Sequence, residues 1–258
     1  MGEYCLKNIR SFQRFAKLML YNRNYFEPNL ESGYKYGYFP EFKWLAIALY
    51  QRFHPKTSLD IGCATGNLVQ RLLELGVDAY GVDISAYAIS RSPVKDRLKQ
   101  VDIVSERLPF ESNYFDLITM LEVIEHISNE ENILKEMRRV LKEDGIIYIT
   151  TPTPKAPPTP EHINIHTESY WVRLFRKYGF DVEIIKPLYS YTWDMAKEWQ
   201  EKWRNLPSTY KIKNRPKIVI KFIEKLPLFI RTLIFYTNGK YKKFKNDRLT
   251  YRFLLKKI

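Results

Sequence analysis

The hydrophobic positions between residues 56 and 186 follow two alternating patterns. Short runs rich in apolar and β-branched residues recur, and longer amphipathic stretches separate them. Because parallel strands need a crossover to reach their neighbours, this alternation predicts βαβ units and a parallel sheet. We expect strands over six ranges, namely 57–61, 78–83, 98–103, 116–121, 145–151 and 180–186.

The amphipathic stretches predict helices between these strands, most clearly over 67–75 and 129–141. The second stretch ends in KEDG, where Gly145 is suited to stop the helix and release the next strand. Residues 151–160 contain five prolines. Because proline lacks an N–H donor, we expect a loop at a strand end there, and neither a helix nor a central strand.

The segments that flank this core differ from it in pattern. The first residues read as added helices, and a long basic stretch separates the core from a last apolar run, RLTYRFLL. We therefore divide the chain into an N-terminal helical extension (1–55), the core (56–189), a basic helical cap inserted before the last strand (190–246) and a final sheet-edge strand (247–258).

Positive charge is concentrated in the last third of the chain. The formal net charge is +13, and residues 181–258 hold 19 Lys and Arg against 7 Asp and Glu. Such a region favours an anionic partner, although a solvated basic face explains it equally well. Residues 218–236 are apolar but interrupted by charged residues and proline. We expect them to form a cap over the site, peripheral contact with an anionic membrane, or both.

Only two cysteines, Cys5 and Cys63, occur in the sequence, and they have no paired spacing. Neither a disulfide framework nor a cysteine zinc site is therefore expected. The first residues also lack the uninterrupted apolar run of a signal peptide. These features favour a cytoplasmic protein, and no pattern in the sequence defines its oligomeric state.

A Gly-rich turn in SLDIGCATGNLVQRL joins an apolar strand to an amphipathic helix. Asp60 stands near the strand end, and Gly62, Ala64 and Gly66 are small residues at every second position. Such a turn lets the backbone approach a ligand and exposes N–H groups at a helix N-terminus. The next strand ends at Asp83, whose two carboxylate oxygens suit the hydroxyls of a ribose; the alternatives are a helix N-cap and a solvated loop acid.

Five ordered segments, LDIGCATG, GVDIS, VDIVSERLPFESNYFDLI, EVIEHI and GIIYITTPTP, resemble the class I S-adenosylmethionine-dependent methyltransferase family over about residues 55–186. The resemblance implies an α/β, Rossmann-like, doubly wound fold with a mostly parallel seven-stranded sheet, and S-adenosylmethionine as cofactor. For Cys63 the alternative role is small buried packing. The resemblance implies donor binding by Asp60, Gly62, Cys63, Ala64, Gly66, Asp83, Ile84, Asp102, Ile103 and Leu121.

The segment MLEVIEHI follows the fourth predicted strand at the carboxyl edge of the sheet. Glu122, Glu125 and His126 form an ExxEH pattern, and an early helical turn would put Glu122 beside both other residues. A second segment, EHINIH, follows the proline loop and carries His162 and His166. Oxygen and nitrogen ligands of this kind bind magnesium, manganese, iron or zinc.

This ExxEH pattern with a later histidine resembles two metal-assisted branches of the family, the ubiquinone-pathway O-methyltransferases and the small-RNA 2′-O-methyltransferases. The resemblance implies Glu122, Glu125, His126 and His162 as ligands of a divalent metal, with His166 as a substitute. In metal-free relatives the same histidine packs or acts as a base. We therefore also name His126, with Glu125, as the catalytic residues for an alcohol or phenol acceptor.

Together these features predict a methyltransferase that acts on an oxygen of a small-molecule, lipid-linked or glycan acceptor. One alternative is an RNA methyltransferase that uses the basic last third, which is weakened because no RNA-binding module is recognisable. The other is a protein that binds S-adenosylmethionine without catalysis.

Overall fold

The computed structural model describes residue 21 and residues 40–157, 159–185 and 249–258, which belong to one compact unit. The predicted cap over 190–246 and most of the predicted N-terminal extension lie outside the described residues. In chain order the elements are α3 (Pro40–Phe53), β1 (Thr57–Ile61), α4 (Asn67–Glu74), β2 (Asp78–Asp83), α5 (Ala86–Ser90), the 3-10 helix η1 (Lys95–Arg97), β3 (Leu98–Gln100), β4 (Phe115–Leu121), the 3-10 helix η2 (Ile124–His126), α6 (Glu131–Val140), β5 (Leu141–Pro152), α7 (Glu168–Lys177), β6 (Phe180–Ile184) and β7 (Thr250–Lys257).

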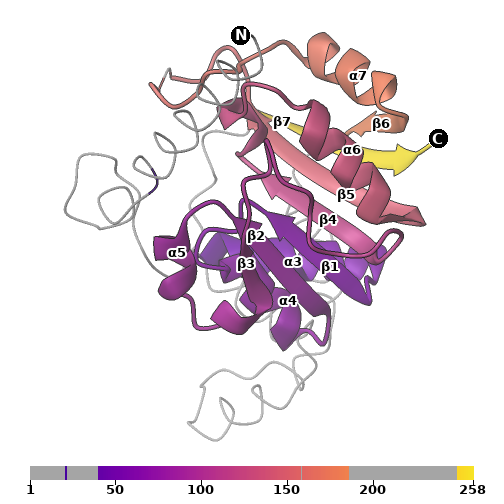
Figure 1. Cartoon of the computed structure of the whole chain (residues 1–258). Coiled ribbons are helices and arrows are strands. Elements are labelled where there is room, and N and C mark those ends of the chain that lie inside the picture. Colours follow the sequence, from indigo (N-terminus) through magenta and orange to yellow (C-terminus); the bar gives the residue numbers. More distant parts are fainter. Residues whose placement is uncertain (1–20, 22–39, 158, 186–248) are drawn as a thin grey trace, which may run out of the picture. The chain divides into compact units, whose positions relative to one another are not determined.

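The described strands form one seven-stranded sheet in the order β3-β2-β1-β4-β5-β7-β6 (Figure 1). Neighbouring strands from β3 to β5 are parallel, and β7 runs antiparallel to both β5 and β6. This order confirms the Rossmann-like, mostly parallel seven-stranded sheet.

The predicted last strand is present, but it does not lie at the sheet edge. It inserts between β5 and β6, so β6 is the edge strand on that side. Phe253, Leu254 and Leu255 in its centre are all buried, with exposed fractions of 0%, 3% and 0%. Consecutive buried side chains show that both faces of β7 are covered, and its inner position pairs both of its edges with neighbouring strands.

The direction of travel across the sheet reverses between β1 and β4. Because parallel crossovers are right-handed, β1–α4–β2 and β4–α6–β5 place their helices on opposite faces. α4 contacts β1 and β2, and α6 lies beside α7 over the other half of the sheet (Figure 1). At such a reversal a crevice opens outside the carboxyl ends of the strands, and there the site forms.

Helix α6 shows how the predicted amphipathic pattern becomes core. Ile133, Leu134, Met137 and Val140 recur at helical spacing and are buried in the main hydrophobic cluster. Trp171 of α7 packs into the same cluster and is fully buried. Burial of each such large side chain contributes about 1.5–3 kcal/mol, so this layer stabilises the half of the sheet formed by β4 to β7.

Strand β5 is longer than predicted at both ends. It begins at Leu141, which is already extended where α6 ends, so Gly145 lies inside the strand and does not stop the helix. A Cβ at Gly145 would lie 2.7 Å from Leu141 Cδ1 and 3.0 Å from the Phe115 carbonyl oxygen, so packing requires the glycine. Thr151 and Pro152 also belong to β5, where they pair with β7. The proline loop therefore begins after Pro152.

Strand β3 is shorter than predicted and ends at Gln100. Two residues later Asp102 accepts hydrogen bonds from the Val104 N–H (3.1 Å) and the Ser105 hydroxyl (2.8 Å). A side chain that bonds the backbone ahead of it turns the chain, which is why the extended run stops here.

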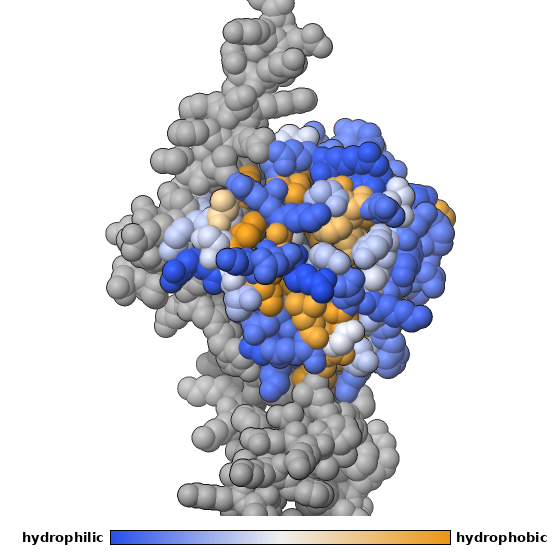
Figure 2. Space-filling view, turned by 60° about the horizontal axis from the view of Figure 1, so that its bottom comes forward, coloured by the Kyte–Doolittle hydropathy of each residue, from blue (hydrophilic) through white to orange (hydrophobic). Residues whose placement is uncertain are grey.

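The described surface is mostly polar. In Figure 2 hydrophilic residues cover most of the face shown, with smaller hydrophobic areas between them. Large hydrophobic residues that are exposed, among those described, are Ile163, Ile184 and Ile258. No helix in this part of the chain is long and apolar enough to cross a lipid bilayer.

Candidate active site

The turn after β1 places backbone, not side chains, beside a cavity. Gly62 (φ 74°), Ala64 (φ 48°) and Gly66 (φ 71°) all have left-handed backbone conformations. A side chain at Gly62 would collide with Val123, which follows β4. The N–H of Gly62 donates to the Val82 carbonyl at 2.8 Å, which fastens the turn to the end of β2. Small residues are therefore required by both conformation and space.

Asp83 at the end of β2 lies on the same cavity and is held by backbone donors. Its Oδ2 accepts the Ala64 N–H at 2.7 Å, and its Oδ1 accepts the Ser85 N–H at 2.8 Å. Burial raises the pKa of Asp83, and these hydrogen bonds oppose the shift. Since a carboxylate oxygen accepts two hydrogen bonds, both oxygens retain capacity for a ligand's hydroxyl groups.

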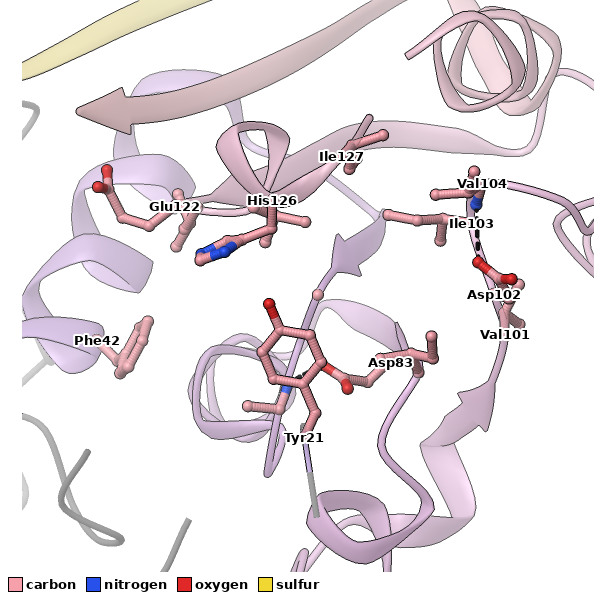
Figure 3. A pocket seen from close by; sticks show the side chains of 15 residues that line it. Tyr21, Phe42, Asp83, Val101, Asp102, Ile103, Val104, Glu122, His126 and Ile127 are labelled. Atoms are coloured by element: carbon pink, nitrogen blue, oxygen red, sulfur yellow. Dashed lines mark hydrogen bonds between the residues drawn. The ribbon is translucent and has the colours of Figure 1, made fainter. Parts of the chain in front are cut away.

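The cavity has a volume of about 380 Å³, within the range of small-molecule and cofactor sites. Figure 3 shows Asp83 and Asp102 on one part of its wall and His126 on another, with the Tyr21 hydroxyl turned toward His126. The lining residues are Tyr21, Phe42, Gly62, Ala64, Asp83, Ile84, Val101, Asp102, Ile103, Val104, Leu121, Glu122, Val123, His126 and Ile127.

Most of the predicted donor-binding residues line this cavity, whereas Asp60, Cys63 and Gly66 do not. Asp60 is buried behind the turn, where its Oδ1 accepts the Thr119 hydroxyl at 2.6 Å, and burial raises its pKa to about 7. Cys63 is buried against Gly81, and burial raises the pKa of its thiol. Gly66 is the N-cap of α4. The position of Cys63 therefore agrees with the alternative role, a small buried residue that packs in the core.

Glu122 does not share a helical turn with the rest of the ExxEH pattern. The helix η2 begins only at Ile124, and Glu122 stands before it with a left-handed φ of 54°. Its N–H donates to the Thr150 carbonyl at 3.0 Å, so pairing with β5 continues through this residue. Glu122 lines the cavity, but its carboxylate points away from the His126 ring (Figure 3).

Glu125, His126 and His162 come together as a cluster. One ligand atom from each lies within 4.8 Å of those of the other two. Glu125 is fully buried; its Oε2 accepts the Thr151 hydroxyl at 3.2 Å, and its Oε1 has no hydrogen-bond partner among the described residues. Burial, reinforced by the charge of Glu122, raises the pKa of Glu125 to about 8. Burial lowers the pKa of His162, which favours its neutral form.

The ring of His126 has a defined tautomer. Nδ1 lies 2.9 Å from the Glu161 carbonyl oxygen, which can only accept, so Nδ1 carries the hydrogen. In the neutral ring Nε2 is then the nitrogen without hydrogen. This atom lies 4.0 Å from Glu125 Oε1. The ring therefore presents an acceptor nitrogen to the cluster.

His166, the predicted substitute ligand, lies outside the cluster. Its ring stacks on Tyr170 with centroids 3.7 Å apart. His166 precedes α7, and its ring also meets the Trp171 ring edge-on with centroids 5.6 Å apart, so it packs with the aromatic residues of that helix. His162 is thus the histidine of the EHINIH segment that the fold brings to His126.

Sequence reasoning missed Tyr21 and Phe42 as cavity residues. The Tyr21 carbonyl accepts the Ser85 hydroxyl at 2.6 Å, and its ring meets the His126 ring edge-on with centroids 6.1 Å apart. Ser85 also caps α5 by accepting the Ala88 N–H. Neither aromatic residue stands in a local motif, so only its tertiary position reveals it.

A sheet of this order, with a small-residue turn after β1 at the reversal point and a carboxylate at the end of the neighbouring β2, is typical of Rossmann-like domains that bind a cofactor containing a nucleoside. The chain belongs to the methyltransferase-domain family, whose model matches residues 42–184, more than half of the chain. S-adenosylmethionine is the cofactor of this family.

Similar proteins include a ubiquinone biosynthesis O-methyltransferase of Glaesserella parasuis, 31% identical over 37% of this chain and 45% of the relative. The mitochondrial ubiquinone biosynthesis O-methyltransferase of Rattus norvegicus is 34% identical over 36% of this chain and 30% of that protein. A sterol 24-C-methyltransferase of Gibberella zeae is 31% identical over 35% and 26%. The matches therefore span less than half of these relatives' own lengths.

Solved structures share the fold at low identity. An S-adenosylmethionine-dependent methyltransferase of Archaeoglobus fulgidus has a TM-score of 0.51 at 19% identity, covering 84% of this chain and 94% of that one. The cyclase SpnF has a TM-score of 0.52, also at 19% identity, covering 83% and 81%. Since one of these is named as a cyclase, the fold alone does not define the reaction.

Proposed function

We propose that this chain uses S-adenosylmethionine to methylate an oxygen of a small-molecule, lipid-linked or glycan acceptor. The observation that carries the proposal is a single cavity whose wall holds both Asp83 and His126. The Asp83 carboxylate is suited to a ribose, and Nε2 of His126 is a ring nitrogen without hydrogen. Relatives named as ubiquinone O-methyltransferases support an oxygen acceptor.

The residues present fit this cofactor. The Asp83 carboxylate has unused lone pairs toward the cavity, and the backbone of Gly62 and Ala64 reaches the cavity wall. Val101 and Ile103 add apolar wall of the kind that holds a base. When bound, S-adenosylmethionine supplies an electrophilic methyl group.

His126 is the residue that we propose for proton transfer. A hydroxyl is a weak nucleophile until its proton is removed, and Nε2 of His126 can accept that proton. The buried Glu125 carboxyl, 4.0 Å from Nε2, would stabilise the resulting imidazolium once ionised. The apolar residues around the ring, including Val123 and Ile127, limit access of water to this step.

Calorimetry with S-adenosylmethionine and S-adenosylhomocysteine tests the donor site. Asp83→Asn should weaken both by about 10–100-fold, because charge-assisted hydrogen bonds contribute about 1.5–3 kcal/mol. Asp181→Asn, on the exposed side of β6, is the matched control and should bind like the wild type. Folded wild type that binds neither compound would contradict the proposal.

As an alternative to proton transfer by His126, we propose a divalent metal at Glu125, His126 and His162, because Oε1 of Glu125 in this cluster is buried with no hydrogen-bond partner among the described residues. Two histidines and one carboxylate suit zinc, manganese or iron better than magnesium or calcium. The hydrogen bond from Nδ1 of His126 to the Glu161 carbonyl is the support that a ligating histidine usually has. A metal held here would polarise an acceptor oxygen.

The two neighbouring histidines provide a matched pair for testing the metal. After chelator treatment, titration with Zn²⁺ or Mn²⁺ should show one site in the wild type and in His166→Gln. His162→Gln should lose at least about 10-fold in affinity, since it removes one of three ligands. Equal loss in both variants, or no stoichiometric binding by the wild type, would exclude the site while leaving the methyltransferase proposal intact.

A further inference from the structure

The loop that carries His162 is fastened to η2 by the His126–Glu161 hydrogen bond and by Asn164, which bonds η2 through both its backbone N–H and its buried side chain. The Asn164 N–H donates to the Glu125 carbonyl at 2.9 Å, and its amide Nδ2 donates to the Ile124 carbonyl at 3.4 Å. Nδ2 also forms a short hydrogen bond with the Glu130 carboxylate at the start of α6. Asn164 and Glu130 are each only 9% exposed. Buried polar bonds of this kind fix one arrangement strongly, because breaking them leaves unsatisfied groups.

The same loop provides the carbonyl that orients His126. Glu161 lies three residues before Asn164, and its carbonyl accepts the hydrogen on His126 Nδ1. Hydrogen bonds within the loop, such as His162 N–H to the Thr159 carbonyl, shape it but do not attach it to η2. The bonds of Asn164 make that attachment, so they hold the Glu161 carbonyl opposite the His126 ring.

We infer that Asn164, held by Glu130, is a positioning residue that sets the tautomer of His126. Asn164 is not among the residues that line the cavity, so we assign its effect to the Glu161 carbonyl. With that carbonyl in place, the hydrogen stays on Nδ1 and the lone pair of Nε2 faces Glu125. Without it, water competes for Nδ1 and the other tautomer becomes populated. The consequence for turnover rests on the proposed function, whereas the tautomer itself does not.

The direct test is the nitrogen NMR spectrum of ¹⁵N-histidine-labelled protein, treated with chelator and recorded above the pH range in which free histidine titrates. The chain contains four histidines, so the His126 signals can be assigned by their loss in His126→Gln. In neutral imidazole the nitrogen that carries hydrogen and the one that does not have well-separated chemical shifts. The wild type should show hydrogen on Nδ1.

Two nearly isosteric changes separate the role of the amide from that of the charge. Asn164→Asp removes the Nδ2 donors and sets two carboxylates against each other, so His126 should shift to a mixture of tautomers. Glu130→Gln keeps an acceptor oxygen for Asn164 and should retain the wild-type tautomer. In the double variant the amide and carboxylate exchange places, and the reversed hydrogen bond should restore the Nδ1 hydrogen at least in part.

A folded Asn164→Asp protein that keeps the hydrogen entirely on Nδ1 would overturn the inference. If that variant does not fold, Glu130→Ala serves as the test instead. It removes the hydrogen bond between the Asn164 amide and the Glu130 carboxylate without changing a residue of the loop. An unchanged His126 tautomer in folded Glu130→Ala would overturn the inference equally. In an active enzyme, Asn164→Asp should lower kcat by about 10–100-fold with little change in KM for the donor. The spectrum reports the tautomer even if no turnover is found.

Discussion

The two halves of the cavity, which we propose to hold the methyl donor and the acceptor and call the donor half and the acceptor half, are held in different ways. On the donor half, backbone N–H groups of Ala64 and Ser85 fix the Asp83 carboxylate, and all three residues stand at the ends of neighbouring parallel strands. On the acceptor half, His126 takes its orientation from the Glu161 carbonyl, 35 residues further along the chain. The donor half is thus part of the sheet, whereas the acceptor half depends on a loop. Such a division lets acceptor preference change while the cofactor site is kept.

Two buried carboxyl groups outside the cavity lining, those of Asp60 and Glu125, also differ. Burial raises the pKa of Asp60 to about 7 and that of Glu125 to about 8. Asp60 accepts the Thr119 hydroxyl, but Oε1 of Glu125 has no partner among the described residues. Asp60 is therefore satisfied as it stands, whereas Glu125 retains an oxygen suited to a further ligand.

The largest effect should come from His126→Gln on the acceptor half. Loss of a positioned base typically lowers turnover by about 10²–10⁴-fold, while donor affinity should stay within about 2-fold of the wild type. Rapid-quench measurement of a single turnover, with calorimetry for the donor, makes this comparison. His166→Gln should leave both quantities unchanged. Normal turnover by His126→Gln, where chemistry limits the rate, would rule out the role of this residue.

Gly62→Ala should test whether the halves are mechanically separate. The left-handed backbone costs about 1–2 kcal/mol and crowding against Val123 about 1–3 kcal/mol, so we expect about 3 kcal/mol of lost stability. Val123→Ala in the same chain should recover more than about 1 kcal/mol, which a double-mutant cycle by urea unfolding measures. Additive effects would show that no contact joins the two halves at this point.

The same comparison explains what the sequence could predict. β1 and β2 end where their apolar runs end, and the Gly-rich turn lies between them, so the donor half is encoded locally. The position of β7 between β5 and β6 depends on sheet order, which hydrophobic periodicity does not contain. Glu122 looked helical by spacing, but pairing with Thr150 holds it in a left-handed conformation. For the acceptor half, the sequence therefore predicts which residue types are present but not how their side chains are arranged.

Glu125→Gln should reveal the unsatisfied acid through the pH dependence of stability. The pKa of Glu125 is raised from 4.5 in the unfolded chain to about 8 in the folded protein. The stabilising contribution of its protonated form to the free energy of unfolding is therefore complete below pH 4.5 and is lost as pH rises through 8. The shift corresponds to at most roughly 5 kcal/mol, and the buried amide costs about 1–3 kcal/mol, so the variant should gain about 2 kcal/mol near pH 8.5. Thermal unfolding of chelator-treated protein across this range measures the gain.

Glu143→Gln provides the control for that experiment, because Lys257 lowers the pKa of this exposed carboxyl. Its contribution should have the opposite sign, being present at neutral pH and lost as pH falls below 4.5. A Glu125→Gln curve that runs parallel to the wild type at every pH would mean that Glu125 ionises normally in the folded protein.

The smallest effect should come from Ala64→Gly on the donor half. Ala64 has a φ of 48°, a conformation that costs a side-chain-bearing residue about 1–2 kcal/mol and glycine almost nothing. Glycine also adds about 0.4–1 kcal/mol of chain entropy to the unfolded state, so the expected net gain is about 0.5–1 kcal/mol. Donor affinity should be unchanged, because the Ala64 N–H still donates to Asp83. Ala79→Gly, in the middle of β2, is the control: this position has no such strain to relieve, so the variant should lose stability. If Ala64→Gly is destabilised as well, the left-handed conformation of Ala64 costs the wild-type protein little.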